Sequence, residues 1–515
     1  MRRTAVRPPL QGKGGPRRAA LALLPVLTAL ALGLWGLRRD GTMWRDESVT
    51  YQMAHRSLPE LWSALGNVDA VHGLYYLLMH AWFAGWDGGP AALRLPSALA
   101  MAASAGAVAW LGRYLVGPRA GIVAGLVFAV LPPVQMYAQE GRSYALVCAG
   151  VTASTCLFVR AAAWRPGGSG GGGGGRRWCG IARWTAYAAV TWVACLLHEL
   201  AVLALLAHGT TLYLCRRRLA RRTRTAWIIS ASAVAAGILP LVVLSMRQQE
   251  QLAWLGRPSW SGWAGFVAVV LAGTALARVP VRGRGPVSPA ALALPLLVLP
   301  AAVLMTVSLT KPLFIDRYVL YSAAGFAVLA GAALDPLLRP GSLRRLVPVG
   351  ALRSAAIAVA AAAVVSALVP LHLQLRKPES RRDDVAGIAL AVRKAAEPGD
   401  AILFMPARRR EWRMSYATQY REVRDIALER DPVASGSLQG SELPAREIRA
   451  RMLAEERIVT ASDPARQSLD TVEPEVVKRS VLRTHFEVCS RTEVRGGRIT
   501  VWARKGHCGA DGPLR

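Results

Sequence analysis

Charged residues are scarce in this chain. Asp, Glu, Lys and Arg make up 18% of its 515 residues, whereas hydrophobic residues make up 53% and the mean hydropathy is +0.29. Soluble domains carry about 25% charged residues, so this composition excludes a soluble enzyme or a nucleic-acid-binding module as a first interpretation. Apolar runs of about 20 residues, long enough to cross a bilayer, recur through residues 20–372. The sequence therefore predicts a polytopic α-helical membrane protein.

Cysteine is also sparse, and its placement excludes a secreted disulfide scaffold. Two of the seven cysteines, Cys489 and Cys508, lie near the C-terminus. An outer compartment permits disulfides, so these two either pair or remain free thiols. The other five lie in or beside apolar runs: Cys148, Cys156, Cys179, Cys195 and Cys215.

Acidic residues are half as numerous as basic ones, 32 against 63, which leaves a net charge of +31. The arginines gather in short loops between apolar runs, where basic residues hold the loops of a membrane protein in the cytoplasm. We therefore expect membrane orientation to account for the charge, and no nucleic acid among the partners. The basic clusters are Arg113–Arg119, Arg160–Arg183, Arg216–Arg224, Arg278–Arg284 and Arg339–Arg353.

Residues 1–18 form a basic tail in front of an apolar run from Ala19 to Leu37. This run is long enough to span, and no small-residue cleavage pattern follows it before Arg38. We expect a cytoplasmic tail and an uncleaved first span, which gives about 11 transmembrane helices within residues 19–372. The further spans are expected at 92–112, 120–137, 143–163, 184–198, 200–215, 226–245, 262–278, 289–309, 317–338 and 354–372.

The segment Gly73–Trp86 decides the parity of these spans. It is apolar for only about 14 residues, nearer the length of an interfacial or re-entrant helix than of a span. If it spanned, the cluster Arg113–Arg119 would lie outside, against the positive-inside rule that basic loops face the cytoplasm, here called the charge rule. We therefore place it on the membrane surface, in a first outer loop of residues 39–91 with interfacial helices. The outer side then also holds residues 138–142, 246–261, 310–316 and 373–515.

Two segments differ in composition from the apolar runs. The Gly run 167–175, in a cytoplasmic loop of residues 164–183, lacks the Lys-Ser/Thr of a phosphate-binding loop, which favours a flexible linker. From about residue 373 charged residues increase and apolar runs shorten, which predicts a small extracytoplasmic α/β domain over residues 373–515. Its expected elements are a helix at Val385–Ala396 and strands at Ala401–Met405, Arg457–Thr460 and Ile499–Ala503.

Ionisable residues gather at the ends of the predicted spans. Asp46 and Glu47 follow the first span, and a carboxylate so placed can take a proton from an attacking hydroxyl. The alternative is a helix N-terminus, where acids suit the helix dipole. Asp69 and His72 lie three apart, so on one face of a helix they could bind a metal or hold a phosphate. Their alternative role is a polar cap of the interfacial segment.

At three further places in the sequence, the ionisable residues fit either a functional role or an ordinary structural role. Glu140 and Arg142 lie where the chain turns back into lipid, a depth at which ionisable residues are costly and often functional, although a loop salt bridge would also place them there. His198 has no second His four residues later, so it is not part of a zinc-protease helix and could simply form an interhelical hydrogen bond. Arg317 could clamp a phosphate bidentately or anchor its span at the interface.

Two motifs joined to the carboxylate pair give the chain a recognisable pattern. Leu93–Ala98 reads LRLPSA and Tyr137–Leu146 reads YAQEGRSYAL. With the acids after the first span, they resemble glycosyltransferase family 39, and more broadly the bacterial mannosyltransferase and aminoarabinose-transferase superfamily with the C-type glycosyltransferase fold. The resemblance covers residues 19–340. The chain departs from the family at Val71–Tyr76, where a His-Pro-Pro-Leu-Tyr-Tyr run is common and the prolines are missing here.

The resemblance implies transfer of a sugar, mannose or another hexose or pentose, from a polyprenyl-phosphate carrier to an extracytoplasmic acceptor, with inversion. Asp46 would be the general base, and Glu47 would orient it or the acceptor. Phosphate charge would be neutralised by Arg142 and Arg317. A divalent metal stays open, with Asp69, His72 and His198 as candidate ligands. The expected substrate-binding residues are Asp69, His72, Tyr75, Arg94, Gln139, Glu140, Arg142, His198, Lys311, Arg317 and Tyr318.

Other functions for a cell-membrane protein of this kind remain open at the level of sequence. A transporter or flippase for a lipid-linked sugar would carry ionisable residues at span centres and often internal repeats, and the sequence shows neither. A non-catalytic scaffold whose outer tail binds a partner is the other alternative. The sequence does not identify the sugar or the oligomeric state. It also leaves open whether the acceptor is a protein, a polysaccharide or a lipid.

Overall fold

The computed structural model describes residues 16–164, 173–248, 256–338, 350–465 and 467–508. Several of the predicted features fall wholly or mostly outside these residues. They are the basic N-terminal tail, most of the Gly run 167–175, most of the basic cluster Arg339–Arg353 and the middle of the outer segment 246–261.

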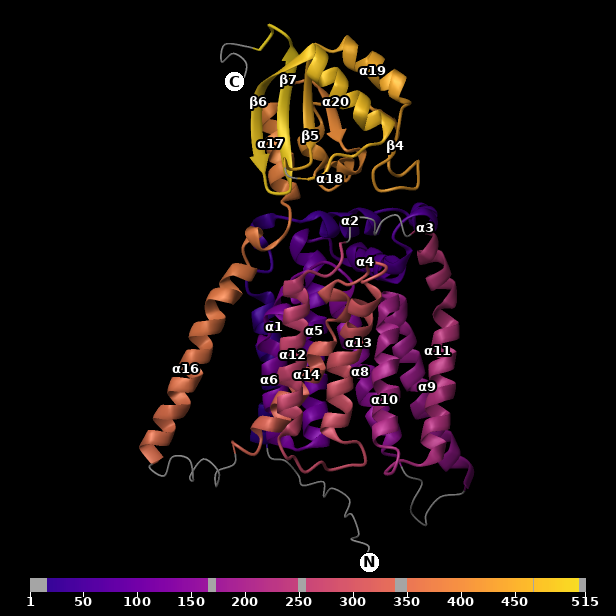
Figure 1. Ribbon diagram of the computed structural model, residues 1–515, viewed down its shortest axis with the longest axis vertical. Coiled ribbons are helices and arrows are strands. Elements are labelled where there is room, and N and C mark those ends of the chain that lie inside the picture. Colours follow the sequence, from indigo (N-terminus) through magenta and orange to yellow (C-terminus); the bar gives the residue numbers. More distant parts are fainter. Residues whose placement is uncertain (1–15, 165–172, 249–255, 339–349, 466, 509–515) are drawn as a thin grey trace, which may run out of the picture.

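A bundle of long helices packs side by side and makes up most of the chain (Figure 1). Among the described residues, six helices are long and apolar enough to cross a membrane, or seven if the bent pair α6–α7 is one span. A helix lies at each of the predicted ranges, but the count of 11 spans stays a prediction. The bundle helices are α1 (Pro16–Leu34), α5 (Pro90–Leu115), α6 (Pro118–Val130), α7 (Pro132–Ala138), α8 (Tyr144–Ala162), α9 (Gly173–Leu197), α10 (Leu203–Leu214), α11 (Arg221–Arg247), α12 (Trp260–Arg278), α13 (Pro289–Val307) and α14 (Ser322–Leu334). A further long helix, α16 (Gly350–Leu375), stands away from the bundle over most of its length (Figure 1).

Small residues let the central helices approach closely. A Cβ atom on Gly121 of α6 would collide with the backbone carbonyl of Ala109 on α5, and one on Gly331 of α14 would lie 2.8 Å from the backbone nitrogen of Ala124 on α6. Helices in lipid associate through such packing because there is no hydrophobic drive between them. The glycines on α6 and α14 therefore set the spacing in the middle of the bundle.

The break between α6 and α7 has a sequence cause. Pro132 stands at the start of α7, and the preceding Leu131 is extended at ψ 128°, as a residue before proline prefers. The two helices are bent by 63°. The bend carries the chain into the turn 139–143, which returns it to α8.

Three short helices cross one end of the bundle, the end that faces the C-terminal domain (Figure 1). We call this end of the bundle the domain end. Ser57 and Glu60 form a capping box at the start of the second helix, with the Ser57 amide donating to the Glu60 carboxylate at 2.9 Å. The third helix covers the predicted interfacial segment. These helices are α2 (Arg45–Ala54), α3 (Leu58–Asn67) and α4 (Gly73–Gly85).

One ionisable side chain lies within a span, where the sequence analysis found none. His208 is fully buried near the middle of α10. Its Nε2 lies 3.0 Å from the Thr155 hydroxyl on α8, and its Nδ1 lies 2.9 Å from the Tyr187 hydroxyl on α9. Both ring nitrogens are therefore hydrogen-bonded, and His208 joins three helices. The expectation that ionisable residues gather only at span ends is wrong at this position.

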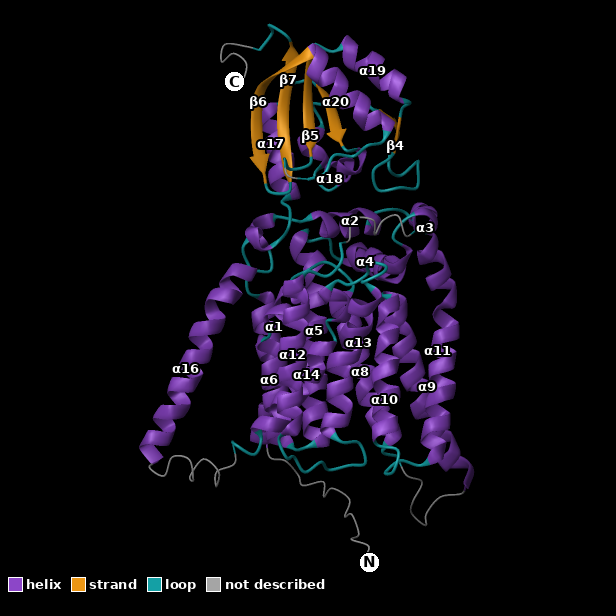
Figure 2. Cartoon of the chain, viewed as in Figure 1, coloured by secondary structure: helices purple, strands orange, loops and turns teal. Residues whose placement is uncertain are grey.

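The C-terminal residues form the predicted small α/β domain, here called the sheet domain (Figure 2). Its five-stranded sheet has the order β2-β1-β5-β7-β6, in which β2, β1 and β5 run parallel and β7 runs antiparallel to its neighbours. Side chains of β1 alternate between two buried clusters, as a strand covered on both faces requires. The main elements are α17 (Val385–Ala395), β1 (Ala401–Met405), α18 (Glu411–Met414), β2 (Arg424–Asp425), α19 (Ala445–Ala454), β5 (Arg457–Ser462), α20 (Glu473–His485), β6 (Phe486–Val494) and β7 (Gly497–Arg504), with β3 (Leu428–Arg430) and β4 (Ser441–Glu442) as a separate pair.

The expected helix and three strands of the sheet domain are present, with ends shifted by at most two residues. The open question about the two C-terminal cysteines has an answer in the structure. Cys489 on β6 and Cys508, beyond β7, form a disulfide with their Cα atoms 5.3 Å apart.

Candidate functional site

Asp46 lies in the first turn of α2 at the domain end, facing an arginine from the other half of the bundle. Its Oδ2 lies 3.0 Å from a guanidinium nitrogen of Arg317, which belongs to the short helix η5 (Asp316–Val319). The Arg317 guanidinium also lies over two aromatic rings, 5.5 Å from the centroid of Trp44 and 5.2 Å from that of Tyr144. The site therefore joins segments from the beginning and the end of the bundle.

Asp46 is ionised although it lies deep in the protein. Burial alone would raise the pKa of its carboxyl group, but the charges of Arg317 and Arg142 outweigh burial and hold the pKa below the ordinary value. About a fifth of the side chain, 22%, is exposed. Asp46 thus presents a carboxylate that a ligand can reach.

A second cluster lies beside it around Arg142, in the turn between α7 and α8. Arg142 donates to the Tyr76 hydroxyl at 2.9 Å and lies 3.7 Å from the Asp69 carboxylate. Tyr76 in turn donates to Asp69. Asp69 has a left-handed backbone with φ 58° just before the 3-10 helix at Ala70–His72, so it does not share a helix face with His72, as a continuous helix would require.

Two histidines and two tyrosines line this part of the site. The ring of His72 lies 5.5 Å from that of His198, and His198 lies 4.6 Å from the ring of Tyr318. Tyr144 lies within 6 Å of both histidine rings. Burial, and then the charges of Arg142 and Arg317, lower the pKa of His198 to about 3 and that of His72 well below its ordinary value. Both imidazoles are therefore neutral at physiological pH.

The charges that remain make the site electropositive. Arg142 and Arg317 are cations, and each has a buried Nε–H without a hydrogen-bond partner among the described residues. An unpaired buried donor costs free energy, of the order of 1–3 kcal/mol, unless a ligand or water takes it. Two guanidinium groups with spare donors suit an anion with several oxygens.

Glu47, adjacent to Asp46, has a different environment. Both of its oxygens lie 2.7 Å from nitrogens of Arg94, and Oε1 also accepts from the Gly141 amide at 3.1 Å. Arg39 lies 3.5 Å away, and the carboxylate is fully buried. Burial alone would raise the pKa of Glu47, but Arg94 and Arg39 lower it to about 2. Glu47 and Arg94 thus join α2 to α5 and to the turn 139–143.

Gln139 also holds the framework together. Its amide nitrogen donates to the carbonyls of Gly33 at 3.0 Å and Trp35 at 2.5 Å, and Arg39 donates to its backbone carbonyl. Tyr75, in the first turn of α4, is fully buried. The polar groups of Gln139 therefore bind the end of the first span and not the open part of the site.

Glu140 is a buried carboxylate at the centre of this framework. Neither oxygen has a hydrogen-bond partner among the described residues, and the nearest cation is Arg381, whose Nε lies 3.6 Å away. Burial raises the pKa of Glu140 to about 7 against the opposing charges of Arg381 and Arg317. Glu140 therefore changes its charge near neutral pH.

The proposed metal ligands do not fit a divalent cation as they stand. Among the described residues there is no group of three or more His, Cys, Asp and Glu side chains that could hold a metal ion. Asp69 already binds Tyr76 and lies beside Arg142, and the two histidines face guanidinium groups. The surrounding positive charge favours an anion instead.

Lys311, a further predicted substrate contact, follows α13 in the chain. It is exposed in the loop between α13 and η5. Its proposed contact with substrate stays a prediction.

Comparison with solved structures identifies the architecture. The apo crystal structure of ArnT from Cupriavidus metallidurans matches with a TM-score of 0.55 and 13% identity, over 97% of this chain and 100% of that chain. The same protein bound to undecaprenyl phosphate matches with a TM-score of 0.51 and 14% identity, over 96% and 100%. The apo oligosaccharyltransferase of Archaeoglobus fulgidus matches with 0.50 and 11%, over 87% and 69%. The chain has the C-type glycosyltransferase fold.

No family model and no curated protein sequence matches the chain. The predicted C-type fold is confirmed, and with it a multi-pass membrane protein that carries a small sheet domain. Family 39 itself stays a resemblance.

Several residues of this candidate site were missed in the sequence. Arg39 and Arg381 lie on segments predicted to be outside, where the charge rule makes arginine uncommon. That exception is the signal that could have pointed to them. Tyr76 and Tyr144 lie in the quoted motifs but were not singled out, because nothing in the sequence distinguishes a tyrosine that binds Arg142 from one that packs in the core.

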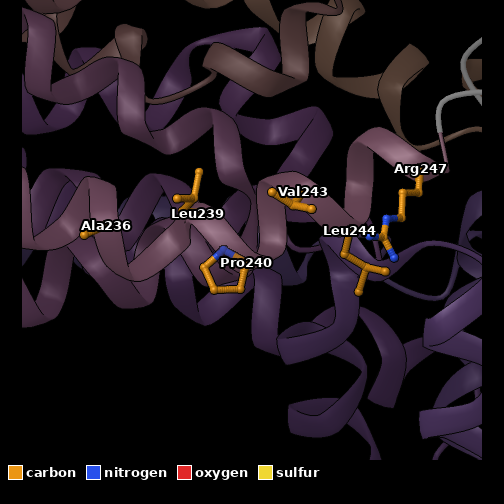
Figure 3. A pocket seen from close by; sticks show the side chains of 6 residues that line it. All are labelled: Ala236, Leu239, Pro240, Val243, Leu244 and Arg247. Atoms are coloured by element: carbon orange, nitrogen blue, oxygen red, sulfur yellow. The ribbon is translucent and has the colours of Figure 1, made fainter.

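One hollow on the described surface lies away from this site. Figure 3 shows a cavity of about 480 Å³ along one face of α11. It is apolar apart from Arg247 at its end. Its lining residues are Ala236, Leu239, Pro240, Val243, Leu244 and Arg247.

Proposed function

We propose that this protein is a membrane glycosyltransferase that moves a sugar from a polyprenyl-phosphate carrier to an acceptor outside the cytoplasm. The observation that carries the proposal is the ionised Asp46 beside Arg317 and Arg142, whose Nε–H groups are unpaired. A base next to a built anion site is what transfer from a sugar phosphate needs. ArnT, which shares the fold, has been crystallised with undecaprenyl phosphate, and this supports a lipid-linked donor.

Binding of the donor phosphate prepares the base. In the structure Asp46 and Arg317 form an ion pair, which keeps the carboxylate weakly basic. A phosphate that takes up the Arg317 donors shares their charge and adds its own. Both effects raise the pKa of Asp46. Asp46 then accepts the proton of the acceptor hydroxyl as the hydroxyl attacks the anomeric carbon.

The leaving phosphate is stabilised on departure. Arg142 and Arg317 lie in a water-poor site, where their charges act more strongly than in water. The neutral rings of His72, His198 and Tyr318 form the wall beside them. Inversion follows when the base and the phosphate face opposite sides of the anomeric carbon. The transferred sugar is mannose or another hexose or pentose.

The charge rule gives the orientation in the membrane. The turns after α5, α10 and α12 hold basic clusters and lie at the end of the bundle opposite the domain end (Figure 2). The positive-inside rule places these turns in the cytoplasm. The site and the sheet domain are therefore extracytoplasmic, where only a membrane-borne activated sugar reaches them.

Replacement of the base tests the proposal. Asp46→Asn, reconstituted in liposomes with a radiolabelled polyprenyl-phosphate sugar, is expected to lower kcat by about 10²–10⁴, because general-base catalysis contributes that much. The control is Glu493→Gln, at an exposed ion pair of the sheet domain, which is expected to leave turnover unchanged.

Undiminished turnover by a normally inserted Asp46→Asn protein would remove Asp46 from the mechanism. A protein that moves the labelled lipid between leaflets without releasing sugar to any acceptor would instead be a transporter. Both measurements use the same liposomes.

A further inference from the structure

The helix that carries Asp46 is held by the sheet domain as well as by the bundle. Arg45, the residue before Asp46, forms an ion pair with Glu411 of α18. The Arg45 backbone amide donates to Asp383 Oδ1 at 2.8 Å, in the segment that leads from α16 into the sheet domain. Two acids from the C-terminal domain therefore bind the first turn of α2.

These contacts continue along one stripe of α2. The Gln52 amide nitrogen donates to the Glu411 backbone carbonyl at 2.6 Å, and the hydroxyls of Ser48 and Ser415 lie 2.6 Å apart. Positions 45, 48 and 52 follow the spacing of one helix face. Glu47, on another face, binds Arg94 in the bundle. The helix is thus held between two bodies, and its rotation decides where Asp46 points.

The segment that supplies Glu411 is itself rigid. Trp412 is fully buried in a core of the sheet domain, and Arg410 is paired with Asp425 and with Glu442. Arg409 pairs with Asp463, directly after β5. The chain around Glu411 is therefore tied to the end of the parallel strands, so that its position follows that of the whole domain.

We propose that Glu411 is a positioning residue for the reaction. Through Arg45 it sets the rotation and depth of the first turn of α2, so that the sheet domain completes the active site. The Glu411 side chain is 2% exposed and that of Arg45 is 35% exposed, and an ion pair that buries a carboxylate is a poor source of stability because desolvation offsets most of its attraction. A role in fixing geometry explains the pair better. The inference rests on the proposed role of Asp46.

The first experiment compares variants of Glu411 in the full-length protein. Glu411→Gln keeps the shape but removes the charge, and we expect kcat to fall about tenfold or more with KM for the lipid donor unchanged, because a small misplacement of a catalytic group is costly. Glu411→Asp keeps the charge and is expected to recover part of the loss. Glu493→Gln, at an exposed ion pair of the same domain, is the control and is expected to match wild type.

The second experiment reports docking without any assay of activity. In Ser48→Cys/Ser415→Cys a disulfide is expected to form readily and to leave turnover largely intact, because it fixes the arrangement seen here. Adding Glu411→Gln is expected to lower the yield of this crosslink.

The outcomes separate the two proposals. If Asp46→Asn retains activity, the proposed role of Asp46 as the base fails, while the crosslink still reports docking. If Glu411→Gln keeps both kcat and the crosslink yield, the positioning role is overturned. A crosslinked protein without activity would also overturn it, because the domain would then have to leave α2 during turnover.

Discussion

Asp46 and Glu47 are neighbours on one helical turn, yet their carboxylates have different surroundings. Asp46 is partly exposed and faces Arg317, whereas Glu47 is fully enclosed by Arg94, Arg39 and the Gly141 amide. Successive residues on a helix point about 100° apart, so one of the pair faces the bundle when the other faces the opening. The family resemblance implied that Asp46 is the base and that Glu47 orients it or the acceptor. The residues alone could not divide these roles, because the division depends on which face of α2 packs against α5.

The buried carboxylate of Glu140, which has no hydrogen-bond partner among the described residues, predicts a dependence of stability on pH. Its pKa is raised to about 7 in the folded protein from an ordinary value of 4.5. Between these values the folded state holds a proton that the unfolded chain has lost. The stabilisation is complete below about pH 4.5 and is lost as the pH rises through 7.

Glu140→Gln is neutral at every pH and tests this dependence. We expect the unfolding temperature of the wild type in detergent to fall more steeply between pH 5 and pH 8 than that of Glu140→Gln. Asp383, whose pKa burial raises to about 6, contributes equally to both proteins. Equal slopes in the two proteins would contradict the assignment.

At the scale of elements, the regular parts of the chain were predictable and the breaks were not. Long apolar runs predict helices wherever they occur, and the alternation around Ala401–Met405 predicts a buried strand. The bend of 63° at Pro132 and the left-handed Asp69 follow from local chemistry that a hydropathy pattern does not contain. Both features determine where site residues lie. The bend leads into the turn that holds Glu140 and Arg142, and the left-handed backbone is that of Asp69 itself.

The polar contact of His208 within the bundle gives a prediction for helix association. His208→Leu removes hydrogen bonds to Thr155 on α8 and Tyr187 on α9. Interhelical hydrogen bonds in membranes contribute about 0.6 kcal/mol each on average and up to about 1.7. We expect a loss of stability of about 1–3 kcal/mol, measured by unfolding in detergent.

The matched control lies on the same helix. Thr211 is fully buried, and its hydroxyl donates to the Ala207 carbonyl of its own helix at 2.8 Å. Thr211→Val is therefore expected to cost less than His208→Leu. Equal losses would show that His208 does not join the helices.

At the scale of the whole molecule, the orientation can be tested with a native thiol. Cys179 is exposed near the start of α9, at the end of the bundle opposite the domain end. A membrane-impermeant maleimide is expected to label it in inverted vesicles but not in intact cells. A cysteine introduced at the exposed Glu493 of the sheet domain is expected to show the reverse. Labelling of Cys179 from outside would overturn the proposed sidedness.

The two bodies of the molecule were predictable, but their contact was not. Composition separates the bundle from the tail near residue 373, and the charge rule brings the loops of Asp46, Glu140 and Arg317 to one end. The docking of α2 on the sheet domain depends on single charges such as Arg45 and Glu411. No periodic pattern connects such distant positions, so only the folded chain shows that they meet.

The order in which the ribosome delivers these parts has a consequence for the cell. Arg381 and Glu411 come from the last third of the chain, long after the segments that carry their partners Glu140 and Arg45 have inserted. A nascent protein with most of its spans in place still lacks both counter-charges. On the proposed mechanism, interrupted translation, or proteolysis that removes the tail, is therefore expected to yield a protein without transferase activity.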